Sequence, residues 1–297
     1  MQELVFPDLP FFDKTKVDSC KEAEDYRPIF FEIYKHVGII CSLISCINKK
    51  SPGIKNISNA HYGLLTGLLN RCSRLMLANV SLSCNGKFGE TTAILDRCIQ
   101  ESAINVRWLC KYEKENSFER FLISGLKSDI ELEKNIKQKI KSRDGKILEI
   151  EKRMLESINR GIYLSGIDRK DFESFPRLPT FETRIKNLDY ENDELPYTVI
   201  QRLGSHHVHG TWTSLLTHYL DEDNGELHPN DNLVSIHVNQ FISVSLEVLE
   251  MLKDFINFIT NENDISDYYL KELTKIREYL DSYRIEVRGN DFEEIKA

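Results

Sequence analysis

Apolar residues recur at helical spacing along most of the chain. The longest runs lie at residues 18–49, 58–83, 90–115 and 232–261, where apolar side chains follow one another at intervals of three and four. This spacing places them on one face of a helix. No segment shows the alternation of apolar and polar residues that marks a half-buried strand. The pattern therefore predicts an all-α fold, a helical bundle in which the strongly apolar helix at 232–261 packs centrally.

Capping residues and a proline indicate where two of these helices begin. Ser58 can cap the helix at 58–83, since its hydroxyl can accept a hydrogen bond from a free amide of the first turn. Asp18 or Ser19 can open the first helix, with Glu22 completing a capping box after Ser19. Pro28 either kinks that helix or marks its true start.

Residues 118–162 carry a narrow apolar seam among many charges. The break at Arg143–Gly145 divides this stretch, so we expect a helical hairpin that resembles an antiparallel coiled coil and protrudes from the bundle. Its charges are expected to be solvated flanks, and its seam is an alternative dimer interface. Residues 164–196 form a loop-rich connection. We therefore expect a single helical domain over residues 1–297, with the hairpin inserted in it.

Three shorter features complete the expected layout. A short helix is expected near residues 180–188. Residues 221–231 are acidic and rich in turn-forming residues, so His228 is expected to be exposed. A last helix is expected from Asp264 or Ser266 to about Tyr283, followed by a polar tail.

The composition narrows the class of protein. Of the 297 residues, 41% are hydrophobic and 29% charged, which is typical of a soluble globular protein. The net charge of −8 gives no overall basic signature of nucleic-acid binding, although a local basic cleft is compatible with it. We expect a cytoplasmic protein without a signal peptide, and no membrane-spanning helix, because no uninterrupted apolar run is long enough.

Cysteine usage supports the same compartment. The seven cysteines all lie in the first 110 residues, none forms a CxxC pair, and their number is odd. A disulfide framework is therefore not expected, and buried reduced thiols are.

Residues 197–220 have the densest polar chemistry in the chain. If this stretch is one helix, Arg202, Ser205 and His209 share a face, His206 lies beside it and His207 points away. Gly204 and Gly210 weaken such a helix and suggest a local break or the close approach of another backbone. The candidate site residues here are Arg202, Ser205, His206, His207 and His209.

The helix at 90–115 supplies a second candidate pair. Arg97 and Glu101 are four residues apart and therefore share one face of the helix. Either they form a surface ion pair, or they are buried because few positions of this helix are clearly exposed. A buried pair would need partners, and its cost would favour a role in a binding site.

Two motifs together resemble a bacterial family of unknown function. The chain has Arg97-x3-Glu101 in one helix and Ser205-x3-His209-Gly210 in a later one. Members of that family carry the same pair of motifs. The resemblance, which covers about residues 90–220, implies an all-helical fold with a polar site that joins the two helices. It implies no established activity.

The spacing of Arg202 and the histidines also resembles the HEPN superfamily, whose motif is Arg-x4-6-His. Arg202 and His207 match it with four intervening residues, and Arg202 and His209 with six. This resemblance implies a metal-independent endoribonuclease in a phage-defence or toxin–antitoxin setting. His207 or His209 would act as general acid or base, Arg202 would hold the scissile phosphate, and the site would form between the protomers of a homodimer.

Two other interpretations stay open, so whether the protein is an enzyme is undecided. A polar network among Arg97, Glu101, Ser205 and His209 could fix helix register in a non-enzymatic module that binds a protein partner or regulates one. His206, His207 and His209 with Glu101 are residue types that bind metals, but neither H-E-x-x-H nor E-x-x-H spacing occurs. We expect no metal and no cofactor.

The remaining residues of interest have ordinary structural interpretations. His36, His61, His218 and His237 each stand alone on a predicted helix, so they are expected to be satisfied core or surface histidines. Trp108 and Trp212 are expected in the core.

Overall fold

Helices dominate the structure. The computed structural model describes residues 5–84, 86–188, 204–230, 232, 234–261 and 264–288. The helices of this part are α1 (Lys14–Glu22), α2 (Arg27–Ser45), α3 (Asn59–Ser83), α4 (Gly89–Lys111), α5 (Ser117–Ser142), α6 (Glu149–Ser165), α7 (Phe181–Lys186), α9 (Gly204–His209), α10 (Trp212–His218), α11 (Val238–Ile259) and α12 (Asp264–Arg288). Short 3-10 turns lie at Glu113–Glu115 and Arg169–Asp171, and the strands are β1 (Leu220–Asp223) and β2 (Glu226–Pro229). The predicted all-α class is confirmed.

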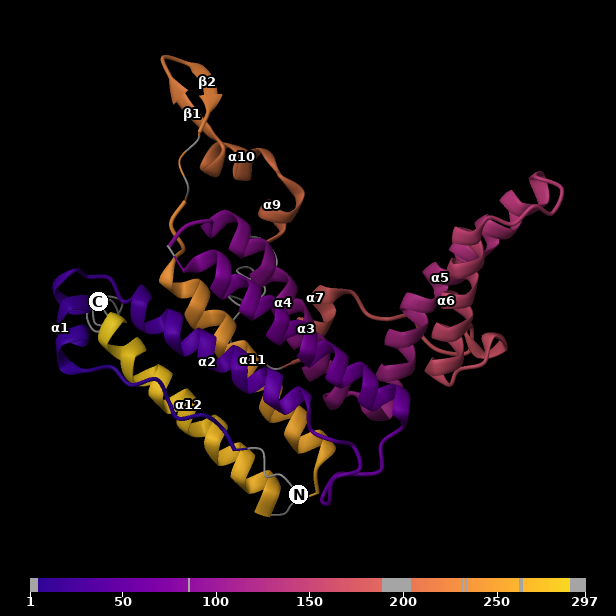
Figure 1. Ribbon diagram of the computed structural model, residues 1–297, viewed down its shortest axis with the longest axis horizontal. Coiled ribbons are helices and arrows are strands. Elements are labelled where there is room, and N and C mark those ends of the chain that lie inside the picture. The colour runs from indigo at the N-terminus through magenta and orange to yellow at the C-terminus, as the bar shows by residue number, and fades with distance from the viewer. Residues whose placement is uncertain are drawn as a thin grey trace.

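The core lies where α2, α3, α4 and α11 pack together, with α12 against α2 and α11 (Figure 1). α11 contacts α2, α4 and α12, as expected for the central helix. It begins at Val238 rather than near residue 232, because His237 caps it. The His237 Nδ1 accepts a hydrogen bond from the amide of Asn239 at 3.2 Å, and the Gln240 side chain accepts one from the His237 amide at 2.9 Å.

The N-terminal helices show one correct and one wrong boundary. Ser58 caps α3 and accepts a hydrogen bond from the His61 amide at 3.1 Å, as predicted. The single helix predicted from Asp18 or Ser19 to about residue 49 is wrong. α1 is capped instead by Asp13 and ends at Glu22, and Pro28 lies in the first turn of α2, where a missing amide costs nothing.

α5 and α6 pack against each other and extend away from the bundle (Figure 1). Between them, Asp144 and Gly145 adopt positive φ angles of 53° and 83°, which end α5. A small apolar cluster of their own fills the space between the helices and the following loop. Its buried members are Ile123, Leu126, Ile158, Ile162 and Phe172.

β1 and β2 form an antiparallel hairpin where the sequence predicted only a loop. Asn224 and Gly225 join the strands with φ angles of 53° and 83°, the conformation that an Asn-Gly turn supplies in two-residue hairpins. The strands are short and largely exposed, so they lack the alternating pattern that reveals a strand. His228 is exposed, as predicted.

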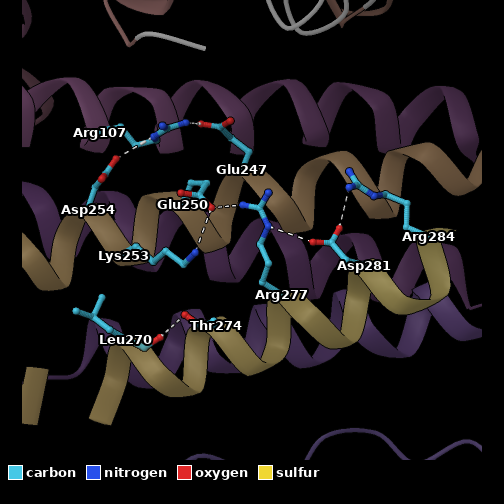
Figure 2. Close-up of polar contacts among 10 residues, drawn as sticks. All are labelled: Arg107, Glu247, Glu250, Lys253, Asp254, Leu270, Thr274, Arg277, Asp281 and Arg284. Carbon is cyan, nitrogen blue, oxygen red and sulfur yellow. Dashed lines mark hydrogen bonds and ion pairs between the residues drawn. The ribbon is translucent and has the colours of Figure 1, made fainter. Parts of the chain in front are cut away.

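Ion pairs join α11 to the helices on either side of it (Figure 2). Arg107 of α4 lies 3.0 Å from Glu247 and 2.9 Å from Asp254, both on α11. On the other side, Arg277 of α12 pairs with Glu250 of α11. Because Arg107 and Glu247 are largely buried, removing one partner would leave the other charge buried with less compensation, which costs more than the ~0–1 kcal/mol of an exposed pair.

One helix of the described part, α2, is long and apolar enough to cross a membrane by length and composition. Of that stretch, 56% is buried inside the structure. Ile29, Ile33, Ile40 and Ile44 of α2 have no exposed surface beyond 1%. A core helix of a bundle meets the same length and composition criterion, and α2 packs as one.

All seven cysteines are free. Cys20, Cys41 and Cys72 are buried, as expected for reduced core thiols. Cys46 and Cys84 are exposed, so the expectation of burial fails at these two positions.

The start of α4 lies directly against the segment that precedes α11. The Gly89 amide donates a hydrogen bond to the Val234 carbonyl at 2.9 Å, and the Gly89 carbonyl accepts one from Gln240 at 3.3 Å. A Cβ atom at position 89 would lie 2.6 Å from the Ser235 carbonyl oxygen. Glycine is therefore required here by close backbone approach.

We predict that Gly89→Ala lowers the free energy of unfolding by about 1–3 kcal/mol, because the added methyl group forces two backbone segments apart. Urea denaturation measures the change. Gly63→Ala is the matched control, since a Cβ there would have no neighbour within 4 Å. Alanine should stabilise that exposed helical position by up to about 1 kcal/mol. Equal stability of Gly89→Ala and the unmodified chain would contradict the proposed constraint.

A buried carboxyl group joins three of the central helices. Asp96 of α4 accepts hydrogen bonds from Asn79 of α3 at 2.6 Å and from Gln240 of α11 at 3.0 Å. The same Asn79 amide donates to the Tyr34 hydroxyl at 3.1 Å. Burial raises the pKa of Asp96 to about 7, because the loss of water outweighs the two hydrogen bonds that lower it.

We predict that this group makes stability fall as pH rises from about 4 to about 7. In that range the unfolded chain releases the Asp96 proton and the folded chain retains it. The effect is ~1.4 kcal/mol for each unit by which folding raises the pKa. Asp96→Asn removes the titration, and rotation of the Asn79 amide, whose Oδ1 is buried without a partner, can supply an acceptor for the new amide.

Chemical denaturation at several pH values measures this contribution as the difference between the two proteins. The difference should change through the stated range and be constant above it. A difference that is independent of pH would show that Asp96 does not titrate in this way.

Candidate functional site

One face of α4 carries a row of polar residues. Glu90, Arg97, Glu101 and Asn105 follow one another at intervals of seven, four and four, which place them on the same side of the helix. α9 and α7 both pack against α4. Contacts with other elements divide this row into two clusters. One cluster includes histidines, and the other includes a second arginine.

The first cluster lies at the start of α4 and is called here the histidine junction. The rings of His207 in α9 and His218 in α10 lie 4.8 Å apart between centroids. Glu90 is near enough to His207 to influence its charge. Ser214, buried one turn before His218, completes the cluster. Four of its buried polar atoms have no hydrogen-bond partner: Glu90 Oε2, His207 Nδ1, Ser214 Oγ and His218 Nδ1.

The surroundings of His207 favour its neutral form. Burial lowers the pKa of this imidazole, and the neighbouring rings of His218 and His206 lower it further, while the charge of Glu90 acts in the opposite direction. A neutral imidazole retains a nitrogen that can accept a proton. His207 is therefore suited to act as a general base at neutral pH.

Gly210 and His206 set the position of the junction. Gly210 adopts a φ of 55°, which ends α9 and starts a new direction for α10. The His206 ring lies 2.8 Å from the Thr211 hydroxyl at this turn. The local break suggested by the glycines is present, and it allows α10 to return His218 to His207.

The second cluster, called here the arginine pair, lies between α4 and α7. The guanidinium of Arg97 lies 4.3 Å from the centroid of the Phe181 ring, and that of Arg184 lies 5.6 Å from the same ring. Arg184 donates a hydrogen bond to Asn105 at 2.6 Å. Burial lowers the pKa of both arginines, and the charge of Glu101 opposes this.

The arginine pair also has unused donors. Arg97 Nη1 and Arg184 Nε are buried and have no hydrogen-bond partner. Buried polar groups in folded proteins are almost always paired, so two neighbouring guanidiniums with unpaired donors are suited to bind an anion.

The structure places the predicted site residues unequally. Arg97 and Glu101 are both half-buried, which lies between the exposed and the buried alternatives for this pair. His206 and His207 are half-buried at the junction, whereas His209 is exposed. Arg202 lies outside the described residues, and for Ser205 only the backbone is described. Their predicted shared face with His209 stays a prediction.

Several residues of the two clusters escaped sequence reasoning. His218 was expected to stand alone, and this is wrong, because its ring contacts His207. It follows His207 by eleven residues, and Glu90 precedes Arg97 by seven, which are both same-face helical spacings that could have drawn attention. Arg184 lies in a six-residue helix and had no such signal.

The structure also bears on the two tryptophans and on the metal-site alternative. Trp108 is buried, as predicted, but Trp212 is 60% exposed, so its predicted place in the core is wrong. Within the described residues, no three His, Cys, Asp or Glu side chains are arranged to hold a metal ion. The alternative of a metal site at His206, His207, His209 and Glu101 therefore has no support from the geometry.

We predict that the His207 ring titrates with a midpoint below 6.5. Glu90→Gln should lower the midpoint further, because it removes the negative charge that favours the imidazolium. His218→Ala should raise it, because it removes a neighbouring positive charge and admits water. NMR titration of the histidine ring protons measures the His207 midpoint in the unmodified chain and in both variants. Replacement of the exposed His228 is the control. A midpoint at or above 6.5 would contradict the proposed surroundings of His207.

The comparisons with known proteins identify a family but no activity. Residues 62–227, more than half of the chain, match the family described as "Family of unknown function (DUF5677)". No significant match exists among curated proteins or among solved structures. The match agrees with the resemblance to a helical family of unknown function and gives no support to the resemblance to the HEPN superfamily. It spans α4, α7, α9 and α10, which carry both clusters. The chain therefore belongs to the DUF5677 family, whose function is unknown.

Proposed function

We propose that the protein is a metal-independent endoribonuclease in which His207 and His218 form the acid–base pair. The observation that supports this is the set of buried polar atoms without partners at the histidine junction. Each of the two neighbouring imidazoles has an unpartnered nitrogen, and such nitrogens can take up and deliver a proton at a phosphodiester.

The chemistry uses the two clusters in different ways. His207, neutral for the reasons given above, removes the proton of a ribose 2′-hydroxyl. The 2′-oxygen attacks the adjacent phosphorus, and the bond from phosphorus to the 5′-oxygen breaks. His218 gives a proton to that leaving oxygen, so the products are a 2′,3′-cyclic phosphate and a free 5′-hydroxyl. The negative charge of Glu90 stabilises the imidazolium that His207 becomes in this step.

The arginine pair would bind a phosphate of the substrate. Glu90 and Arg97 are seven residues apart, which is about 10 Å along the helix. Arg97 and Arg184 would therefore hold a phosphate neighbouring the one that is cleaved, and their free donors would find their acceptors there. A cytoplasmic setting, in phage defence or with an antitoxin, stays a prediction. It fits a ribonuclease activity that the cell has to keep under control.

We predict cleavage of labelled single-stranded RNA by the purified full-length chain in the presence of a chelator. His207→Ala and His218→Ala should each reduce the rate by about 10²-fold or more, the usual contribution of a general acid or base. Arg97→Ala should mainly raise KM. His228→Ala is the matched control, because this histidine is exposed on β2, outside the junction.

The products distinguish this chemistry from contamination. A 2′,3′-cyclic phosphate end that is lost in both histidine variants and kept in His228→Ala would support the assignment. Intact RNA across varied sequences, or cleavage that persists in both variants, would overturn it.

A second candidate is a non-enzymatic module that binds a protein partner. The specific observation in its favour is the outward face of α10, where Trp212, Leu215 and Leu216 are exposed. RNA left intact, together with a measurable association of a different protein with this face, would favour this candidate.

A further inference from the structure

α10 is amphipathic, but its polar side faces the protein and its apolar side faces outward. Its inward side carries Ser214, which is 3% exposed, and His218 of the histidine junction. Its outward side carries Trp212, Leu215 and Leu216, which are 60%, 36% and 41% exposed. A helix of a globular protein normally turns its apolar stripe inward. The outward stripe therefore has the character of a surface that binds another molecule.

This surface extends beyond α10 and has a marked charge. We call it the platform, and it consists of the exposed residues Val208, Trp212, Leu215, Leu216, Tyr219 and Leu227. The adjoining hairpin carries four exposed carboxylates, and residues 205–230 contain neither lysine nor arginine. The carboxylates are those of Asp221, Glu222, Asp223 and Glu226. An apolar surface with an acidic rim fits a basic partner with exposed apolar residues.

The far end of α5 and α6 has these properties. Residues 134–153, called here the tip, contain eight lysines and arginines against three aspartates and glutamates. Ile147, Leu148 and Ile150 of the tip are 58%, 50% and 52% exposed. The tip thus offers an apolar surface with a basic rim, the complement of the platform.

Within one chain the two surfaces stand apart. Figure 1 shows the tip at the end of α5 and α6 and the platform on α10 and the hairpin, which project from the bundle in different directions. A contact between them therefore requires two molecules. Contact between two platforms would bring their carboxylates together and be repulsive.

We propose that two copies of this chain form a dimer in which the tip of each docks on the platform of the other. Two such contacts, related by a twofold axis, satisfy both surfaces of both copies and close the assembly. The interface combines apolar burial by Trp212 and Leu148 with opposite charges at the rims. It does not depend on the proposed ribonuclease activity, because neither surface includes the proposed catalytic atoms.

Charge reversal in the full-length chain tests the proposal. One variant reverses the platform with Asp221→Lys, Asp223→Lys and Glu226→Lys. The other reverses the tip with Lys139→Glu, Lys141→Glu and Lys146→Glu. All six positions are exposed, so folding should persist, and circular dichroism checks this. Each variant alone should dimerise about tenfold more weakly or worse, because its two surfaces now carry like charges.

An equal mixture of the two variants is the decisive sample. The basic platform of one variant then meets the acidic tip of the other, and the acidic platform of the second meets the basic tip of the first. Both contacts are restored, so analytical ultracentrifugation should show a heterodimer. An added quencher should reduce the fluorescence of Trp212 less in this mixture than in either variant alone, because the platform is then covered.

The control matches the charge change at positions away from both surfaces. Asp8→Lys, Glu22→Lys and Glu278→Lys replace three exposed carboxylates and should leave dimerisation unchanged. A wild-type chain that stays monomeric at high concentration would overturn the proposal. So would a dimer that withstands both reversals, or a mixture of the two variants that fails to associate.

Discussion

The burial of α4 on every side is the constraint on which the rest of the structure depends. α3, α11, α7 and α9 all pack on it, so its polar residues must find partners inside the protein or remain unpaired at high cost. Toward α3 and α11 the partners exist: Asp96 receives two amides, and Arg107 meets two carboxylates. Toward α7 and α9 they are incomplete, because Glu90 and Arg97 both keep unpaired atoms.

This contrast separates structural polar residues from candidate functional ones. A network that only fixed helix register would be expected to satisfy its own donors and acceptors, as Asp96, Asn79 and Gln240 do for most of their atoms. The histidine junction and the arginine pair do not, although each includes a residue of the same helix, Glu90 or Arg97 of α4. Their unpaired polar atoms are able to bind a ligand. Their residue types suit a phosphate with a nearby proton to transfer.

Sequence reasoning succeeded where a single helix decides the outcome. Periodicity and a capping serine located α3, and the apolar run located α11, because these signals are local. It failed where the outcome depends on what lies opposite. Trp212 looked like a core residue because its spacing is helical, and spacing alone cannot tell which face meets the bundle. The junction was missed because Gly210 redirects α10, which brings His218 to His207 from eleven residues away.

The geometry of α10 links the two surfaces discussed here. His218 and Tyr219 are adjacent in sequence, and one contacts His207 while the other lies on the platform. A short helix with polar contacts on one side and an uncovered apolar side has little to hold it in place on its own. A molecule that covers the platform would bury the apolar side of α10, while its other side keeps His218 against His207.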